Sequence, residues 1–125
     1  MSGMVSKIFD LFDALEEDEN GIWGEEQSSQ LRSLLEENAD PNEMKHWPGF
    51  GSSSKTLLSH AILFGYLEAV KILAESGADV NKSCRFFYVT ENPIHYVYAK
   101  YEMDEDDETA LKMMKILFEN GQKID

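Results

Sequence analysis

Apolar residues recur three and four positions apart in two short runs near the middle of the chain, which is the spacing of one helix face. The two faces consist of Leu57, Leu58, Ala61 and Ile62, and of Leu67, Val70, Ile72 and Leu73. Gly65 separates the runs and Gly77 follows the second, and glycine favours the left-handed backbone with which many helices end. The pattern predicts two helices of about ten residues each, and helices this short need packing against neighbours to persist.

Similar patterns flank this central pair. Before it, one set of apolar residues recurs at helical spacing and a second set forms another face: Val5, Ile8, Phe9, Phe12 and Leu15, then Leu31, Leu34 and Leu35. After it, the run Ile116-Leu117-Phe118 leads to Gly121. We therefore predict an all-α protein with about three helix pairs.

The stretch from Lys55 to Asn81 resembles an ankyrin repeat, a unit of roughly 33 residues with two helices and a turn signature of the type Gly-Ala-Asp-x-Asn. The residues that carry the resemblance are Thr56, Leu58, Ala61, Gly65, Leu67, Glu68, Val70, Lys71, Leu73, Glu75 and the run Gly77-Ala78-Asp79-Val80-Asn81. The resemblance implies a solenoid in which each helix pair covers the apolar side of its neighbour.

Two further segments fall into register with this unit. Leu34 to Asn42 resembles the end of an earlier repeat, with Asn38 in place of the helix-ending glycine, and Asn92-Pro93-Ile94-His95 stands where the family has Thr-Pro-Leu-His. The resemblance implies that His95 bonds neighbouring backbone. The helix-ending positions 38, 77 and 121 are 39 and 44 residues apart, so each unit is longer than the family's. The excess falls in two extended hairpin loops and in an acidic insertion of about eight residues within the last repeat.

The predicted architecture is thus a single domain over residues 1–125, with residues 1–30 as a degenerate first repeat or helical cap and residues 31–125 as recognisable repeats. Its formal net charge is −13, which disfavours direct binding to nucleic acid or to an anionic membrane and favours a basic protein as partner. The charge is uneven: residues 1–44 carry −10, residues 45–101 carry +2 and residues 102–125 carry −5. Neither a membrane span nor a signal peptide is recognisable, so we expect a cytoplasmic protein that is monomeric when free.

Catalytic and metal-binding patterns are weak. The segment from Glu16 to Gln27 partly follows a calcium-binding loop, but glutamine occupies the position of the bidentate glutamate. Ser59 and His60 are adjacent on one helix and point in different directions, and no motif supports a thiol mechanism at Cys84, the lone cysteine. We expect no enzymatic activity, no cofactor and no metal.

Aromatic and acidic residues outside the helix stripes are the candidates for partner binding. They are Trp47, Phe50, Arg85, Phe86, Phe87, Tyr88, Tyr98, Tyr101, Glu102, Asp104, Glu105, Asp106, Asp107 and Glu108. The loop aromatics either fold back onto the helices or serve as binding anchors, and the acidic run either steers a partner or is seated in it.

The predicted function is that of a protein-binding module that neutralises a basic toxin, nuclease or other effector. In class it resembles the small acidic ankyrin proteins of bacteria that act as immunity proteins against toxins. The alternatives are a phage-type nucleic-acid mimic that blocks a DNA-binding defence enzyme, and a generic ankyrin scaffold.

Overall fold

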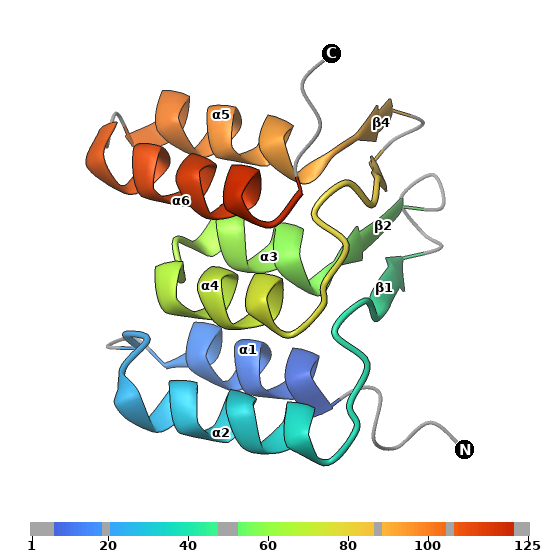
Figure 1. The fold of residues 1–125 in the computed structure, drawn as a ribbon, viewed down its shortest axis with the longest axis vertical. Helices are drawn as coiled ribbons and strands as arrows, with labels where there is room; N and C mark the ends of the chain where they lie inside the picture. The colour runs from blue at the N-terminus through green and yellow to red at the C-terminus, as the bar shows by residue number, and fades with distance from the viewer. Residues whose placement is uncertain (1–6, 19–20, 48–52, 87–88, 105–106, 122–125) are drawn as a thin grey trace.

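The computed structural model describes residues 7–18, 21–47, 53–86, 89–104 and 107–121, and within these residues the chain forms six helices in three pairs. The pairs are α1 (Lys7–Glu17) with α2 (Glu25–Glu36), α3 (Leu57–Phe64) with α4 (Leu67–Glu75), and α5 (Pro93–Asp104) with α6 (Asp107–Glu119). The pairs stack on one another in chain order (Figure 1). The predicted three helix pairs are therefore confirmed.

The stack has two helical layers, because α3 contacts both α1 and α5 while α4 contacts both α2 and α6. One continuous apolar core runs through all three pairs, and its fully buried side chains include Phe12, Leu31, Leu58, Leu73, Val97, Met113 and Leu117. The predicted burial of Leu58, Ala61, Val70 and Leu73 is confirmed, since each is at most 1% exposed. None of the described helices is long and apolar enough to cross a membrane.

A small antiparallel sheet extends from one end of the helices, so the all-α prediction is wrong in this respect. Its strands are β1 (Met44–Trp47), β2 (Ser53–Thr56), β3 (Cys84–Phe86) and β4 (Val89–Glu91), paired in that order. Each extended loop forms one hairpin, and stacking of the helix pairs brings the two hairpins together at Ser54 and Arg85. The sheet lies beside the helices and not between them (Figure 1).

The helix ends confirm the alignment of the units. Asn38 has a left-handed backbone with φ 76°, as do Gly77 at φ 100° and Gly121 at φ 105° in the following units. The residues that follow Asn38 and Gly77 close their helices in the same way. The Ala39 N–H donates to the Leu34 carbonyl, and the Ala78 N–H donates to the Leu73 carbonyl. Asparagine thus replaces the helix-ending glycine, as the sequence predicted.

Two asparagines at equivalent positions link successive units. The Asn42 Oδ1 accepts from the Asp79 N–H at 2.6 Å, and the Asn81 Nδ2 donates to the Gly121 carbonyl at 2.9 Å. Asp40 and Asp79 each support the asparagine two residues on, by accepting its backbone N–H at 2.8 and 2.9 Å. These bonds fix how each helix pair is placed on the next.

The acidic run is largely helical. Glu102 and Asp104 lie in the last turn of α5, and Asp107 and Glu108 begin α6, whereas Glu105 and Asp106 lie outside the described residues. The pair α5–α6 spans residues 93–119 and the pair α3–α4 spans residues 57–75, that is 27 residues against 19. Each helix of the last pair is therefore four residues longer than its counterpart in the middle pair, with 12 and 13 residues against 8 and 9, and the acidic insertion itself stays a prediction.

Candidate partner-binding surface

Large apolar side chains are exposed in two places among the described residues. Tyr98, Tyr101, Leu111 and Phe118 lie on the last helix pair, and Ile22 and Phe64 lie near the turns inside the first two pairs. Single exposed apolar residues are ordinary, but exposed apolar residues that cluster mark surfaces that bind other molecules. The last helix pair carries the larger group.

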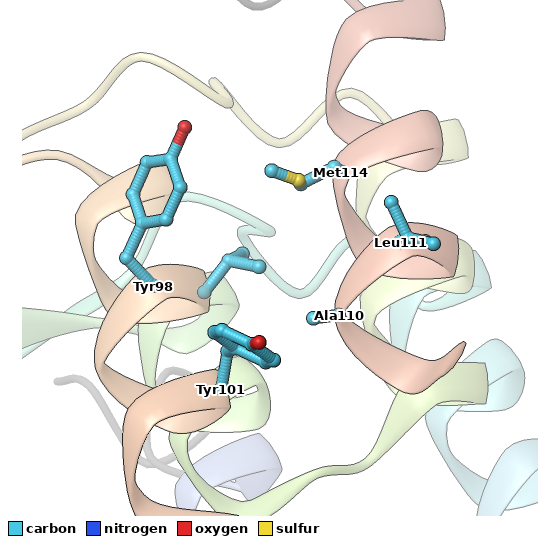
Figure 2. Close-up of a pocket in the computed structure, with 6 residues that line it drawn as sticks. Tyr98, Tyr101, Ala110, Leu111 and Met114 are labelled. Atoms are coloured by element: carbon cyan, nitrogen blue, oxygen red, sulfur yellow. The ribbon is translucent and has the colours of Figure 1, made fainter. Parts of the chain in front are cut away.

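A groove of about 350 Å³ runs between α5 and α6 on the outer face of the last helix pair. Tyr98 and Tyr101 project from α5, opposite Leu111 and Met114 on α6 (Figure 2). Val97 and Ala110 are buried beside them and complete the lining. We call these six residues the terminal groove. Its rim is accessible, with Tyr98 51% and Leu111 64% exposed.

The local sequence explains this geometry. Positions 97, 98 and 101 share one face of α5, and positions 110, 111 and 114 share one face of α6, because residues three and four apart are neighbours on a helix. The N-terminus of α5 is fixed by His95, whose Nδ1 accepts from the Asn92 N–H at 3.0 Å. This bond confirms the predicted structural role of His95.

The opposite end of the stack differs in character. There the outer face of α1 and α2 carries a shallow hollow of about 580 Å³. Its lining consists of exposed Asp10, Ala14, Ser29, Gln30 and Ser33 and of partly buried Leu11 and Leu34. A polar outer face is what the terminal unit of a solenoid needs in water. The α5–α6 end has aromatic and aliphatic side chains at that place instead.

Carboxylates adjoin the terminal groove where α5 ends and α6 begins. Glu102 directly follows Tyr101 and is exposed, and the side chain of Glu108 is 79% exposed. The Glu108 carboxylate forms an ion pair with Lys112 Nζ at 3.0 Å, but so exposed a pair is weak and leaves the negative potential of this region largely intact. The groove thus joins an apolar rim to an acidic end.

The structure divides the predicted set of partner-binding residues. Tyr98, Tyr101, Glu102 and Glu108 come together at the last helix pair. Arg85 is exposed on β3, in the sheet at the other end of the helices from the turn between α5 and α6 (Figure 1). Trp47 and Phe86 end strands β1 and β3, whereas Phe50, Phe87 and Tyr88 lie outside the described residues. The role of all these residues in partner binding stays a prediction.

Sequence reasoning missed Leu111 and Met114. In α6 the buried residues are Ala110, Met113 and Leu117, which form the stripe facing the core. Leu111, Met114 and Phe118 make a second apolar stripe, one position further around the helix. A helix that packs on a core with one side and faces water with the other has only one apolar stripe. The second stripe was therefore the feature of the sequence that could have indicated an exposed apolar face on α6.

The buried histidine is explained by packing and pairing. His60 Nε2 lies 2.6 Å from Glu16 Oε2, and its ring stacks between Phe12 and Phe64, with centroids 5.3 and 4.7 Å away. Burial lowers the pKa of His60, and the bond to Glu16 partly opposes this. Asp13, Glu16 and His60 offer ligand atoms within 4.8 Å of one another, but Lys45 Nζ already lies 3.1 Å from the Asp13 carboxylate. A lysine therefore supplies the positive charge that a metal ion would bring.

The thiol and hydroxyl side chains where α3 meets the sheet are buried. Cys84 is 1% exposed, and its thiol donates to Ser59 Oγ at 3.3 Å in a buried contact. The Thr56 hydroxyl caps α3 by accepting the Ser59 N–H at 3.1 Å. These groups hold the first turn of α3 against the sheet and meet no open cleft.

Stacked helix pairs with hairpins projecting from one end define a helical repeat protein. Residues 54–85 match the family model of the ankyrin repeat, and they comprise β2, α3, α4 and the start of β3. The middle unit of this chain is therefore an ankyrin repeat, which confirms the resemblance seen in the sequence. No curated protein matches the chain. Ankyrin repeats are in general non-enzymatic modules that bind other proteins, and the match over residues 54–85 supports such a role for this chain.

Proposed function

We propose that this chain binds one basic protein through the terminal groove and the carboxylates beside it, and thereby neutralises that protein in the manner of an inhibitor or immunity protein. The observation that carries the proposal is the meeting of an exposed apolar groove with the acidic helix ends at Glu102 and Glu108. A toxin, a nuclease or another cationic effector has the complementary chemistry.

Charge and apolar contact have separate tasks in this proposal. A net charge of −13 attracts a cationic protein over distances of about one Debye length, roughly 8 Å at physiological ionic strength, and so raises the association rate. Tyr98, Tyr101 and Leu111 then exclude water from the contact, and tyrosines in such positions often carry much of the binding energy. Charge therefore governs association and the groove governs dissociation.

The groove favours a protein partner over the nucleic-acid-mimic alternative. A mimic needs carboxylates placed like phosphates, and exposed Leu111 and Tyr98 contribute nothing to that resemblance. A second copy of this chain is also a poor occupant, because two such faces would bring their acidic ends close together. A basic protein with an apolar side chain at its contact satisfies both halves of the surface.

Retention of a partner on immobilised protein tests the proposal. We expect the wild-type chain to retain one basic protein from its native lysate at about 50 mM salt and, in part, at about 500 mM, because apolar contact survives screening. Leu111→Ser removes the most exposed apolar rim residue and should abolish retention at the higher salt, whereas Gln30→Ser, on the polar face at the other end of the stack, should not. Loss of the partner at high salt regardless of Leu111, together with displacement by duplex DNA, would contradict the proposal and support the mimic.

A further inference from the structure

The ends of α1, α3 and α5 and the starts of α2, α4 and α6 lie at one edge of the molecule, at the opposite end of the helices from the sheet (Figure 1). We call this the turn edge. It brings together two acidic segments that are far apart in sequence, namely Glu16-Glu17-Asp18 at the end of α1 and the helix ends around Glu102 and Glu108. The turn of the middle pair lies between them.

An apolar shelf occupies the turn edge between these acidic segments. Ile22 is 80% exposed and Phe64 is 45% exposed, and both line a hollow of about 350 Å³ together with Trp23, Tyr66 and Glu68. The rings pack as one cluster, since the centroid of the buried Tyr66 lies 5.2 Å from that of Trp23 and 5.9 Å from that of Phe64. This shelf is distinct from the terminal groove.

One hydrogen bond fixes the tryptophan of the shelf, and Lys100 of the next helix pair lies beside Gly65. Trp23 Nε1 donates to Ser28 Oγ at 2.9 Å, which fixes the indole ring relative to α2. Gly65 has φ 76°, and a Cβ added there would lie 3.4 Å from Lys100 Cε of α5. A rigid apolar surface loses little conformational freedom when another molecule covers it. Ile22 contributes little to the packing of the folded chain, because it is the most exposed large apolar residue described.

The charges around the shelf complement a basic segment. Glu17 and Asp18 are exposed at the end of α1, Glu68 is exposed in the first turn of α4, and Glu102 is exposed in the last turn of α5, next to Tyr101. Lys100 brings a positive charge close to Gly65, and the exposed Lys71 lies one turn after Glu68 on α4. Acidic groups therefore outnumber basic ones around the shelf among the described residues.

We infer that the turn edge is a second contact surface for the same basic partner. A segment of that partner, in which lysine or arginine residues flank apolar side chains, lies along the shelf and enters the terminal groove. This inference rests on the proposed function and specifies its partner. Tyr101 and Glu102 connect the two surfaces, because Tyr101 lines the groove and Glu102 follows it at the turn edge. With helices packed about 8–10 Å apart, the first and third turns are roughly 20 Å apart. An extended segment needs about six residues to span that distance and a few more to bind at each end.

The length dependence of peptide binding tests this inference. The probes are alternating lysine–leucine peptides of about 6, 12 and 18 residues, compared with lysine–serine peptides of equal length and charge. Trp47→Phe leaves Trp23 as the sole tryptophan, so its fluorescence reports occupation of the shelf. At about 150 mM salt we expect the two longer lysine–leucine peptides to bind at least about tenfold more tightly than the short one, and to shift Trp23 emission.

Variants separate the two surfaces. Ile22→Ser should reduce the affinity for the long lysine–leucine peptides to that for the short one and remove the change in Trp23 emission. Leu111→Ser should weaken the binding of both short and long peptides, whereas Gln30→Ser should leave all affinities unchanged. Equal melting temperatures of the variants exclude unfolding as the cause. If only Leu111→Ser weakens binding, the inference is overturned and the proposed function stands. If only Ile22→Ser does so, the joint contact is overturned. If neither does, and lysine–serine peptides bind equally well, both proposals fail.

Discussion

Asn38 shows at the scale of one residue how this sequence departs from its repeat without changing the fold. Its left-handed backbone costs a residue with a Cβ about 1–2 kcal/mol, although asparagine tolerates this conformation better than most. We expect Asn38→Ala to lower the free energy of unfolding by about 1 kcal/mol and Asn38→Gly to leave it unchanged or slightly higher. Urea denaturation measures both, with Glu37→Ala as the neighbouring exposed control. Equal losses for Asn38→Ala and Glu37→Ala would contradict this account of the helix end.

Glu43 supplies a pH dependence at the same scale. Burial, with Asp40 and Asp10 nearby, raises the pKa of Glu43 from 4.5 to about 7, and its Oε2 has no hydrogen-bond partner among the described residues. Between pH 4.5 and about 7 the Glu43 carboxyl is therefore largely protonated in the folded state and largely ionised in the unfolded state. The stabilisation is fully present below pH 4.5 and is lost as the pH rises through about 7.

The variant Glu43→Gln cannot titrate and should remove this component. The measurement is the difference in unfolding free energy between the wild type and the variant at several pH values from about 4.5 to 8, with wild type losing stability relative to the variant as pH rises. Taking the difference also cancels His60, whose lowered pKa acts in the opposite sense, because its contribution is lost as the pH falls. A constant difference across this range would show that Glu43 is ionised in the folded protein near pH 5.

The middle helix pair is the element on which the stack depends. Leu73 of α4 is fully buried, whereas Leu111 of α6 is 64% exposed. Leu73→Ala should therefore cost roughly 2–5 kcal/mol of unfolding free energy, and Leu111→Ala should change it by less than about 0.5 kcal/mol. Thermal and urea denaturation compare the two. A large loss for Leu111→Ala would mean that the terminal groove is part of the core and unsuited to a partner.

The acidic run should act differently at the two helix ends that contain it. Glu102 lies in the last turn of α5, where the helix dipole disfavours negative charge, and Glu108 lies in the first turn of α6, where the dipole and Lys112 favour it. We expect Glu102→Gln to stabilise the protein and Glu108→Gln to destabilise it, each by a few tenths of a kcal/mol at low salt. Melting temperatures at low and high salt reveal both signs. Shifts of the same sign would show that general repulsion dominates.

The helices and their ends could be predicted from the sequence because they depend on residues that are close together in the chain. The helices follow from apolar spacing, and the ends at Asn38, Gly65, Gly77 and Gly121 follow from residues that tolerate a left-handed backbone. The sheet was missed because Ser54 and Arg85 pair only after stacking brings two hairpins together.

The candidate surfaces were predicted less completely than the fold. Tyr98, Tyr101, Glu102 and Glu108 were named as candidate partner-binding residues, and the structure places them on the last helix pair. Ile22, Phe64 and Leu111 were missed, because whether an apolar residue is covered depends on which helix pair lies beside it. Ile22 and Phe64 come from different units and form one shelf only through the stack.

At the scale of the whole molecule, the stack is polar at the α1–α2 end, apolar at the α5–α6 end and acidic along the turn edge. Under the proposed function, this asymmetry would give a basic partner one preferred place and one preferred orientation. Two acidic segments lie about two helix spacings apart, further than a Debye length at physiological salt, so they act on different parts of an approaching protein. Contact at the apolar surfaces then decides how long the complex lasts.

Chemical-shift mapping by NMR tests the central claim most directly. The backbone amides of the ¹⁵N-labelled chain are followed while the 12-residue lysine–leucine peptide is added at about 150 mM salt. The account predicts saturable changes on the second half of α5 and the first half of α6, including Tyr98, Tyr101 and Leu111, and on the shelf around Trp23 and Phe64. It predicts much smaller changes for Leu111→Ser. Changes spread over all acidic segments, including α2, that the lysine–serine peptide reproduces would contradict it.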